Sequence, residues 1–265
     1  MDQSKIAILT TVANFNLYKK TSVLFPEQCQ KYIIDGSNGM HGIDSILYMM
    51  SKLKGKDIQW LIMADEDVIF SNANLVFDII EEMKAKNITV CGVRDGGLVS
   101  HRNQNPYLIN TFFSILNFKE IESIWSKKEV LKNQFSIENE FQDDLSGLLF
   151  SYDKKSLFEP YYCFYLWLRR KGKLFLFLDA TMQQDGISNK VFFKNKEIFC
   201  HTWYARSYGK NEKHTNRINK ILVEKVNNTN ALNNLNDIIL FKKTTFALEQ
   251  IILKYYKKVL RKLGK

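Results

Sequence analysis

Short apolar runs alternate with amphipathic stretches through the amino-terminal third of this 265-residue chain. The apolar runs have strand length, and the stretches between them carry apolar side chains at helical spacing. The expected strands are 6–12, 31–34, 58–64 and 88–93, and the expected helices are 43–53 and 75–86. Strands that alternate with helices are typical of βαβ units, so we expect an α/β fold with a mostly parallel central sheet flanked by helices. Ligands of such sheets bind at the carboxyl ends of the strands.

The pattern is less regular after residue 94. Residues 98–141, rich in asparagine and aromatic residues, are expected to form loops and short helices over a cleft. A helix is expected from Glu159 to Lys171, because Pro160 suits a first helical turn and Gly172 suits a helix end. Further strands are expected at 148–152, 174–178 and 196–200, a loose asparagine-rich connection at 223–236, and a final helix at 246–263. We expect one domain over residues 1–210 and a helical C-terminal extension over residues 211–265.

The positive charge is concentrated at the carboxyl end. The chain has a net charge of +10, and eight basic residues against one acidic residue lie between Lys242 and Lys265. Apolar residues recur there at helical spacing, at Leu248, Ile252, Tyr255, Val259 and Leu263. A basic amphipathic helix of this kind suits an anionic membrane surface. The alternative is a helix packed on the domain with a solvated basic side. Because the rest of the chain is nearly neutral and lacks RNP-like motifs, a nucleic-acid-binding protein is the weaker alternative.

Cysteine usage and the first residues bear on the compartment. The four cysteines are scattered and form no CxxC pair, so we expect reduced thiols rather than zinc knuckles. Residues 1–5 lack the apolar region of a signal peptide, and no apolar run has the length of a membrane span. We therefore expect a cytoplasmic protein.

An acidic triplet follows the third expected strand directly. The apolar run 60–64 ends in Asp65, Glu66 and Asp67. An extended backbone would aim Asp65 and Asp67 the same way, and converging carboxylates repel each other unless a cation lies between them. Carboxylate oxygens suit Mg²⁺ or Mn²⁺, which commonly share their sites with phosphate oxygens. The alternative is a solvated acidic turn.

In this order the segments resemble the GT-A nucleotide-sugar glycosyltransferases, particularly the family 2-like inverting group that acts on bacterial surface polysaccharides. The resemblance covers about residues 5–206. It is carried by Thr10-Thr11 at the end of the first strand, Asp35-Gly36-Ser37 after the second, Asp65-Glu66-Asp67 at the position of the DxD motif, Glu159 at a helix start and His201 after a late strand. The resemblance implies a metal-dependent enzyme that transfers a sugar from a nucleotide donor, with UDP as the default. The acceptor would be a glycan or a lipid-linked glycan at the inner face of the cytoplasmic membrane.

The resemblance also implies roles for individual residues. Asp65, Asp67 and His201 would bind Mn²⁺ or Mg²⁺, with imidazole favouring Mn²⁺. The donor would contact Thr11, Asp35, Arg94, Asp65, Glu66 and Arg206. Each has a structural alternative. His201 would be a hydrogen-bonded core residue, Asp35 an Asx-turn residue, and Arg206 a surface arginine. Glu66 would point into a neighbouring loop.

The general base is the least defined part of the resemblance. Inverting transfer needs a base that takes the proton of the acceptor hydroxyl. Relatives usually supply it from a Glu-Asp pair at a helix start, which this chain lacks. Glu159 is the closest match, although it would alternatively cap its helix; Asp185 is the competitor, followed by Asp179 and Asp144. Retention of configuration stays open, and the missing pair keeps open a noncatalytic sugar- or nucleotide-binding relative. The donor sugar, the linkage and the oligomeric state are not readable from the sequence.

Overall fold

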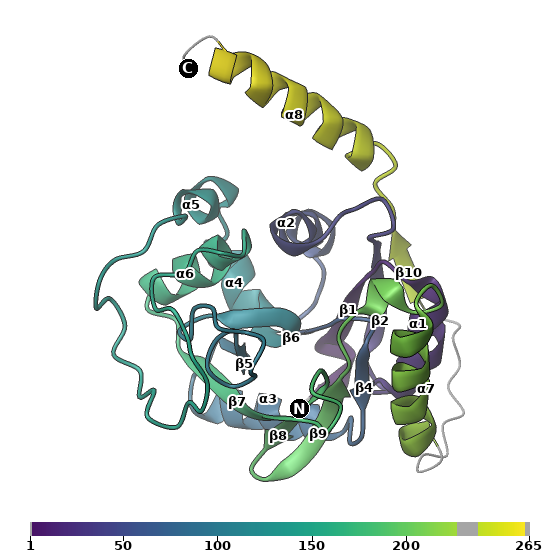
Figure 1. Cartoon of the computed structure of the whole chain (residues 1–265). Coiled ribbons are helices and arrows are strands. Elements are labelled where there is room, and N and C mark those ends of the chain that lie inside the picture. Colours follow the sequence, from purple (N-terminus) through teal and green to yellow (C-terminus); the bar gives the residue numbers. More distant parts are fainter. Residues whose placement is uncertain (1, 227–237, 263–265) are drawn as a thin grey trace.

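The computed structural model describes residues 2–226 and 238–262. Within these ranges ten strands form one sheet in the order β10-β2-β1-β3-β6-β5-β7-β8-β9-β4 (Figure 1). The strands are β1 Ile6–Val12, β2 Gln30–Asp35, β3 Trp60–Ala64, β4 Val68–Phe70, β5 Val90–Arg94, β6 Ile109–Asn117, β7 Phe175–Met182, β8 Asn189–Phe193, β9 Lys196–His201 and β10 Ile238–Phe241. The α-helices are α1 Phe15–Thr21, α2 Gly42–Leu53, α3 Leu75–Ala85, α4 Phe118–Ile124, α5 Lys127–Lys132, α6 Tyr162–Arg170, α7 Glu212–Val226 and α8 Phe246–Lys262.

The sheet is mixed, so the expectation of a mostly parallel sheet is wrong. β10, β2, β1 and β3 run parallel, as do β5 and β7. β6 lies antiparallel between β3 and β5, and β7, β8, β9 and β4 form an antiparallel arm. The error came from residues 98–141, which were expected to lack long strands. β6 places polar Asn110, Thr111 and Ser114 within an otherwise apolar strand, which hid its pattern.

Most elements before residue 94 are confirmed. β1 has the expected bounds, and α2 and α3 each differ from expectation by one residue at one end. The helix expected from Glu159 begins at Tyr162. Residues 148–152 form no strand, because the N–H groups of Leu149 and Phe150 both donate to the carbonyl of Gly97 and fix a loop there. In the stretch expected as a loose connection, residues 223–226 belong to α7, and residues 227–236 lie outside the described ranges.

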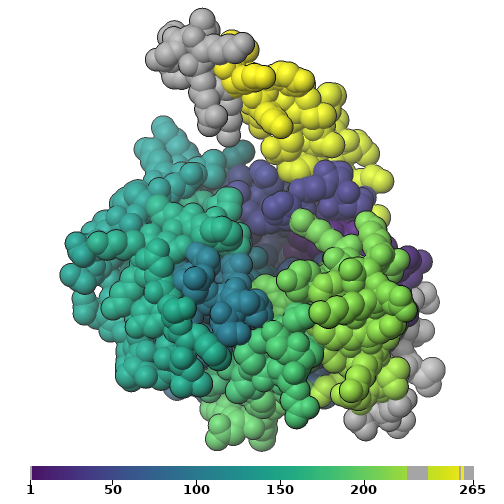
Figure 2. All heavy atoms as spheres, in the orientation of Figure 1, coloured from purple at the N-terminus to yellow at the C-terminus, as the bar shows by residue number. Residues whose placement is uncertain are grey.

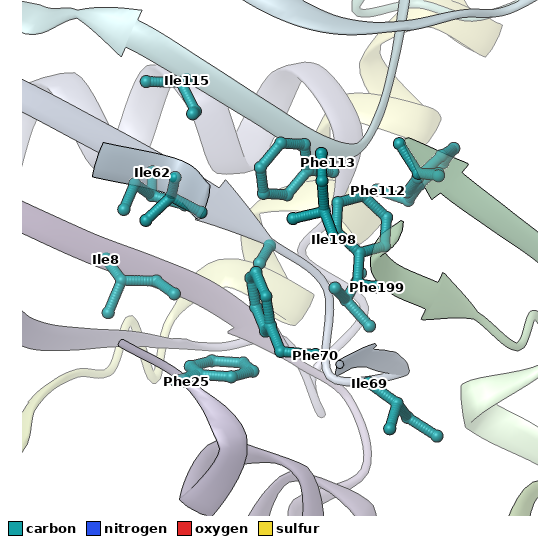
Figure 3. Close-up of a cluster of buried hydrophobic side chains, with 14 of the residues drawn as sticks. Ile8, Phe25, Ile62, Ile69, Phe70, Phe112, Phe113, Ile115, Ile198 and Phe199 are labelled. Carbon is teal, nitrogen blue, oxygen red and sulfur yellow. The ribbon is translucent and has the colours of Figure 1, made fainter. Parts of the chain in front are cut away.

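Both faces of the sheet are covered, which explains the continuous apolar runs of its central strands. Along β1, Ile6 and Ile8 join the core beneath α1, α3 and α7, whereas Ala7 and Leu9 join the core beneath α2, α4 and α6. Figure 3 shows the first core, where the rings of Phe70 and Phe199 lie 5.6 Å apart, centroid to centroid. Burial of an apolar side chain contributes about 1.5–3 kcal/mol. This double core holds the strand ends rigidly, and the candidate site lies at those ends.

The carboxyl-terminal residues contribute to the sheet before the last helix begins. β10 pairs with β2, and the ring of Phe241 stacks on that of Tyr32 at 5.7 Å. Phe246 at the start of α8 is buried, whereas the outer positions of α8 are exposed, and the helix projects from the body in Figure 1. None of the helices in residues 2–226 and 238–262 is both long enough and apolar enough to cross a bilayer.

Candidate functional site

A cavity of about 540 Å³ lies beyond the carboxyl ends of β1 and β3. Its wall includes the acidic triplet, the start of α2, the loop before α6 and the turn that follows β9. The face of the molecule shown in Figure 2 is hollowed beneath α2. Seven of the residues expected from the sequence line the cavity: Thr11, Asp65, Glu66, Asp67, Glu159, His201 and Arg206.

Asp67 and His201 meet because two short strands pair across the sheet. Asp67 immediately precedes β4, and His201 is the last residue of β9. The antiparallel register sets Val68 opposite His201. The carboxylate Oδ1 of Asp67 therefore lies 3.3 Å from Nε2 of His201, and both side chains are buried. Residues far apart in the sequence thus form one polar contact in the cavity wall.

The imidazole of His201 is fixed by ring contacts. Its ring stacks on Phe112 with a centroid distance of 4.0 Å and lies 4.3 Å from that of Trp203. Its Nδ1 is buried and has no hydrogen-bond partner within the described part of the chain. An unpaired buried polar atom costs free energy and calls for an explanation. His201 thus has one polar contact, through Nε2 to Asp67, and one ring nitrogen without a partner in the described residues.

The two other acidic side chains of the triplet have different surroundings. Burial, together with the nearby charges of Glu66 and Asp67, raises the pKa of Asp65 well above its usual value, while Arg206 acts in the opposite direction. Burial and the charge of Asp67 raise the pKa of Glu66 to about 7. Oε1 of Glu66 accepts hydrogen bonds of 3.0 Å from the backbone N–H groups of residues 13 and 14, so this side chain anchors the β1–α1 turn as well as lining the cavity.

The side chains available as metal ligands are of types that suit a divalent cation, but their arrangement does not form a complete metal site. Two carboxylates and one imidazole are acceptable to Mn²⁺. A bound cation would relieve the mutual repulsion that raises the pKa of Asp65. However, no three His, Cys, Asp or Glu side chains of the described residues are grouped so as to hold a metal ion as they stand. Asp67 and His201 are adjacent, and Asp65 borders the same cavity.

A strained turn presents Arg206 to the cavity. Trp203 and Tyr204 have φ values of 58° and 62°, in the left-handed region that bulky residues rarely occupy. Such strain costs on the order of 1–3 kcal/mol per residue and occurs most often at functional sites. The turn is held by Asn14, whose Nδ2 donates to the carbonyl of Ala205 at 3.0 Å. Arg206 itself is exposed and has no hydrogen-bond partner among residues 2–226 and 238–262.

On the opposite wall, Glu159 pairs with an arginine that sequence reasoning missed. Nη2 of Arg102 donates to Oε1 of Glu159 at 2.9 Å, and both side chains line the cavity. Glu159 therefore does not cap α6; the residue at the helix cap is Tyr161, which makes no side-chain capping bond. Asn110, which lines the cavity, was also not expected at the site. The sequence feature that could have indicated this part of the site is the Asp95-Gly96-Gly97 turn, which returns the chain to the end of β5.

Thr11 and Asp35 lie at neighbouring strand ends with different exposure to the cavity. Thr11 lines the cavity, and its hydroxyl hydrogen-bonds that of Ser45 at the start of α2. Asp35 does not line it. Its Oδ1 accepts from the backbone N–H of Ser37 at 3.0 Å, and Lys242 lies 3.4 Å from Oδ2. Burial acts to raise the pKa of Asp35, but these hydrogen bonds and the lysine outweigh it and lower the pKa. This is the geometry of an Asx-turn.

Arg94 and Asp185 are likewise outside the cavity wall. The guanidinium of Arg94 lies 3.5 Å from the ring centre of Phe177 and pairs with Asp143 at 3.5 Å. Asp185 accepts hydrogen bonds from the backbone N–H groups of residues 187 and 188 and pairs with Arg217 at 3.3 Å. Both side chains thus have structural partners where they stand.

Comparison with known proteins gives limited similarity. No family model matches the chain, and no curated protein matches it. Two solved structures are similar over part of it. One is a mannosyltransferase from Pyrobaculum calidifontis in complex with GDP-Man and Mn²⁺, with 7% identity and a TM-score of 0.30, over 45% of this chain and 46% of that one. The other is a glycosyltransferase involved in glycosylation of the major capsid of PBCV-1, with 19% identity and a TM-score of 0.30, over 45% of this chain and 63% of that one. The chain thus covers less than two thirds of each.

Proposed function

We propose that the protein is a metal-dependent glycosyltransferase that moves a sugar from a nucleotide-sugar donor, UDP-linked by default, to a glycan or lipid-linked glycan acceptor. The observation that carries the proposal is the composition of one cavity. The Asp67–His201 contact and Asp65 stand on one wall, and Glu159 stands on another. A sugar nucleotide needs these two kinds of group, one for its diphosphate and one for the incoming hydroxyl.

The first wall would serve the leaving group. Asp65, Asp67 and His201 would hold Mn²⁺ or Mg²⁺, which when bound neutralises the charge that develops on the diphosphate. Arg206 is exposed beside this wall, and its positive charge acts to lower the pKa of Asp65 against the stronger effect of burial. A guanidinium matches the geometry of phosphate oxygens and binds them in pairs. Arg206 would therefore orient the diphosphate.

The second wall would serve the acceptor. The acceptor hydroxyl oxygen attacks the anomeric carbon while the bond from that carbon to the phosphate oxygen breaks, and its electron pair leaves with the diphosphate. Glu159 takes the hydroxyl proton in this step. Its Oε1 is engaged by Arg102, and within the described residues Oε2 has no hydrogen-bond partner, so Oε2 is the oxygen that would receive the proton. A single displacement of this kind inverts the anomeric configuration.

The position of α8 supports a place at a membrane surface. Its side toward the body borders a groove against α2 through Phe246, Gln250 and Leu253. Apolar residues on the remaining sides are half or more exposed to solvent: Leu248, Ile251, Ile252, Tyr255, Tyr256 and Val259. Lysines 254 and 258 are exposed on the same helix. We propose that α8 lies in an anionic surface, the inner face of the cytoplasmic membrane, and that the enzyme acts in surface polysaccharide synthesis.

The test combines binding with turnover. Thermal unfolding is measured with UDP or GDP, with and without Mn²⁺, and a panel of sugar nucleotides is screened for nucleotide release with Mn²⁺. The proposal expects a nucleotide-dependent rise in Tm that needs the metal, and release from at least one donor. Metal-dependent binding without release from any donor would indicate a noncatalytic relative. Absence of both, or stabilisation by oligonucleotides alone, would overturn the proposal.

A further inference from the structure

A fully buried carboxylate accepts hydrogen bonds from several of the side chains that line the cavity. Asp95, directly after β5, has no exposed surface. Its Oδ1 accepts from Nε of Arg102 and Nδ2 of Asn110, both at 2.6 Å. Its Oδ2 accepts from Nη2 of Arg102 at 2.5 Å, and from the hydroxyls of Tyr161 at 3.0 Å and Tyr162 at 2.6 Å. One carboxylate therefore joins the loop after β5, the start of β6 and the segment that enters α6.

The two glycines after Asp95 make this arrangement possible. A Cβ at Gly96 would lie 2.0 Å from the carbonyl oxygen of Gln104, and Gly97 adopts φ +85°. The chain therefore reverses closely enough for the N–H of Gly97 to donate to the carbonyl of Arg102 at 3.3 Å. A side chain at Gly96 would push away the segment that carries Gln104, and one at Gly97 would meet the side chains of Leu148 and Tyr152. The reversal brings the guanidinium of Arg102 back onto Asp95.

Arg102 connects this buried carboxylate to the proposed base. Its guanidinium forms a two-pronged pair with Asp95, and Nη2 also donates to Oε1 of Glu159. Burial acts to lower the pKa of Arg102, but its bonds to Asp95 and Glu159 outweigh burial and raise the pKa. The arginine is cationic, and its charge is shared between two carboxylates. An arginine paired with Glu159 alone would hold that carboxylate more strongly in its ionised form and weaken it as a base.

We propose that Arg102 is a positioning residue that fixes the carboxylate of Glu159, and that Asp95 is the counter-charge that lets Arg102 do so without suppressing the basicity of Glu159. The inference rests on the proposed function through the role of Glu159. Because the Asp95–Arg102 pair is close to neutral, it orients Glu159 through one oxygen without placing a net positive charge beside it. Its other oxygen stays directed to the acceptor proton.

Other ionisable groups border the same space and must be distinguished from this pair. The phenol of Tyr161, two residues after Glu159, donates to Asp95, and burial together with the charges of Asp95 and Glu159 raises its pKa well above the usual value, so it stays neutral. The remaining ionisable side chains that line the cavity are His41, Asp44, Asp65, Glu66, Asp67, His201, Tyr204 and Arg206. None of them has a hydrogen bond or ion pair to Glu159 in the described residues.

Three variants separate orientation from charge. Asp95→Asn keeps the size of the buried side chain and removes the negative charge that faces Arg102. The double variant Asp95→Asn with Arg102→Gln removes both charges. Arg102→Gln alone would leave the buried carboxylate of Asp95 unpaired. Arg102→Lys keeps the cation and loses the planar fork. Each is measured by the pH dependence of kcat/KM, by thermal unfolding, and by a carboxyl-carbon NMR titration of Glu159 assigned with Glu159→Gln.

The proposal expects opposite shifts. In Asp95→Asn the acidic limb of the pH profile and the Glu159 titration midpoint move to lower pH, and in the double variant both move to higher pH than in Asp95→Asn. Arg102→Lys lowers kcat about 10²-fold with little change in the midpoint, because orientation is lost and charge is kept. Equal losses in all variants without a shift, or a midpoint that does not move, would overturn the proposal. If Asp95→Asn does not fold, the double variant is compared with the parent protein, whose Glu159 midpoint it should share because the Asp95–Arg102 pair is close to neutral. A shifted midpoint there, or an unchanged kcat in Arg102→Lys, would overturn the proposal. NMR shifts in a protein that releases no nucleotide would leave the positioning intact and refute the proposed function instead.

Discussion

Nε2 of His201 lies 3.3 Å from Oδ1 of Asp67, in a contact set by the antiparallel register of β4 and β9. The acidic triplet and the late histidine come from distant parts of the sequence, and this register is what brings them together. The contact leaves Nδ1 of His201 without a partner among the described residues. A cation beside Asp67 would give this pair a chemical role that ordinary core packing does not.

Asp67→Asn tests that role. The amide keeps the size of the side chain and can still face His201, so we expect a Tm close to that of the parent protein. Loss of the carboxylate charge should weaken Mn²⁺ binding and lower nucleotide release by about 10²-fold or more. Calorimetric Mn²⁺ titration with UDP present and a release assay provide the measurements. Full metal-dependent turnover in Asp67→Asn would contradict the assignment.

The two candidate bases make a matched pair of variants. We expect Glu159→Gln to lower kcat by about 10²–10⁴-fold, because the amide cannot take the acceptor proton. Asp185→Asn should leave kcat nearly unchanged and lower Tm, because Asp185 holds a turn and Arg217 and lies outside the cavity wall. Steady-state kinetics and thermal unfolding distinguish them. A large loss of kcat in Asp185→Asn with Glu159→Gln active would reverse the assignment.

The site residues that lie at the ends of strands could be predicted from the sequence. Asp65 and Asp67 follow an apolar run, Thr11 lies near the end of another, and parallel β1 and β3 bring these ends to one cavity. The expected parallel arrangement holds there, because those strands alternate with helices and are buried on both faces. Local patterns thus sufficed for β1, β2 and β3.

The cavity wall that carries Arg102 and Glu159 could not be predicted from the sequence, because it forms only where the chain folds back on itself. Arg102 has no periodic or motif context, and it reaches Asp95 only through the reversal at Gly96 and Gly97. β6 was missed since Asn110 interrupts its apolar pattern, yet that side chain donates to the buried Asp95. Residues that serve a site break the local rules from which elements are predicted.

Glu197 gives a pH-dependent prediction about stability. It pairs with Lys190 on β8 at 2.9 Å and with Lys225 on α7 at 2.5 Å. Burial acts to raise the pKa of Glu197, but the hydrogen bonds from Lys225, Ser71 and Lys190 outweigh it and hold the pKa at about 2. An acid whose pKa is lowered on folding stabilises the fold above its unfolded value, near 4.3, and loses that contribution as pH falls toward the folded value.

Glu197→Gln should therefore lower the free energy of unfolding at pH 7 by about 1–2 kcal/mol, after allowance for solvent screening of this partly exposed group. The difference between the two proteins should narrow as pH falls below about 4.5. Urea unfolding followed by circular dichroism across this range measures it. Glu27→Gln, at an exposed carboxylate, is the control and should show no such difference. A gap that is constant with pH would contradict the electrostatic account.

The orientation of α8 predicts unequal effects from two changes of equal charge. Ile252 is 58% exposed, whereas Gln250 borders the groove against α2. Each is replaced by aspartate, and binding to phosphatidylglycerol vesicles is measured by co-sedimentation, with phosphatidylcholine vesicles for comparison. Gln250→Asp adds only a repulsive charge and should cost about 1 kcal/mol of binding free energy. Ile252→Asp also removes an apolar contact worth about 1.5–3 kcal/mol, so its affinity should fall at least tenfold further.

Nucleotide release from a soluble donor should stay the same in both variants, because neither residue lines the cavity. Equal losses of vesicle binding would mean that the exposed apolar face does not enter the membrane, and unchanged binding in both would mean that α8 does not bind it.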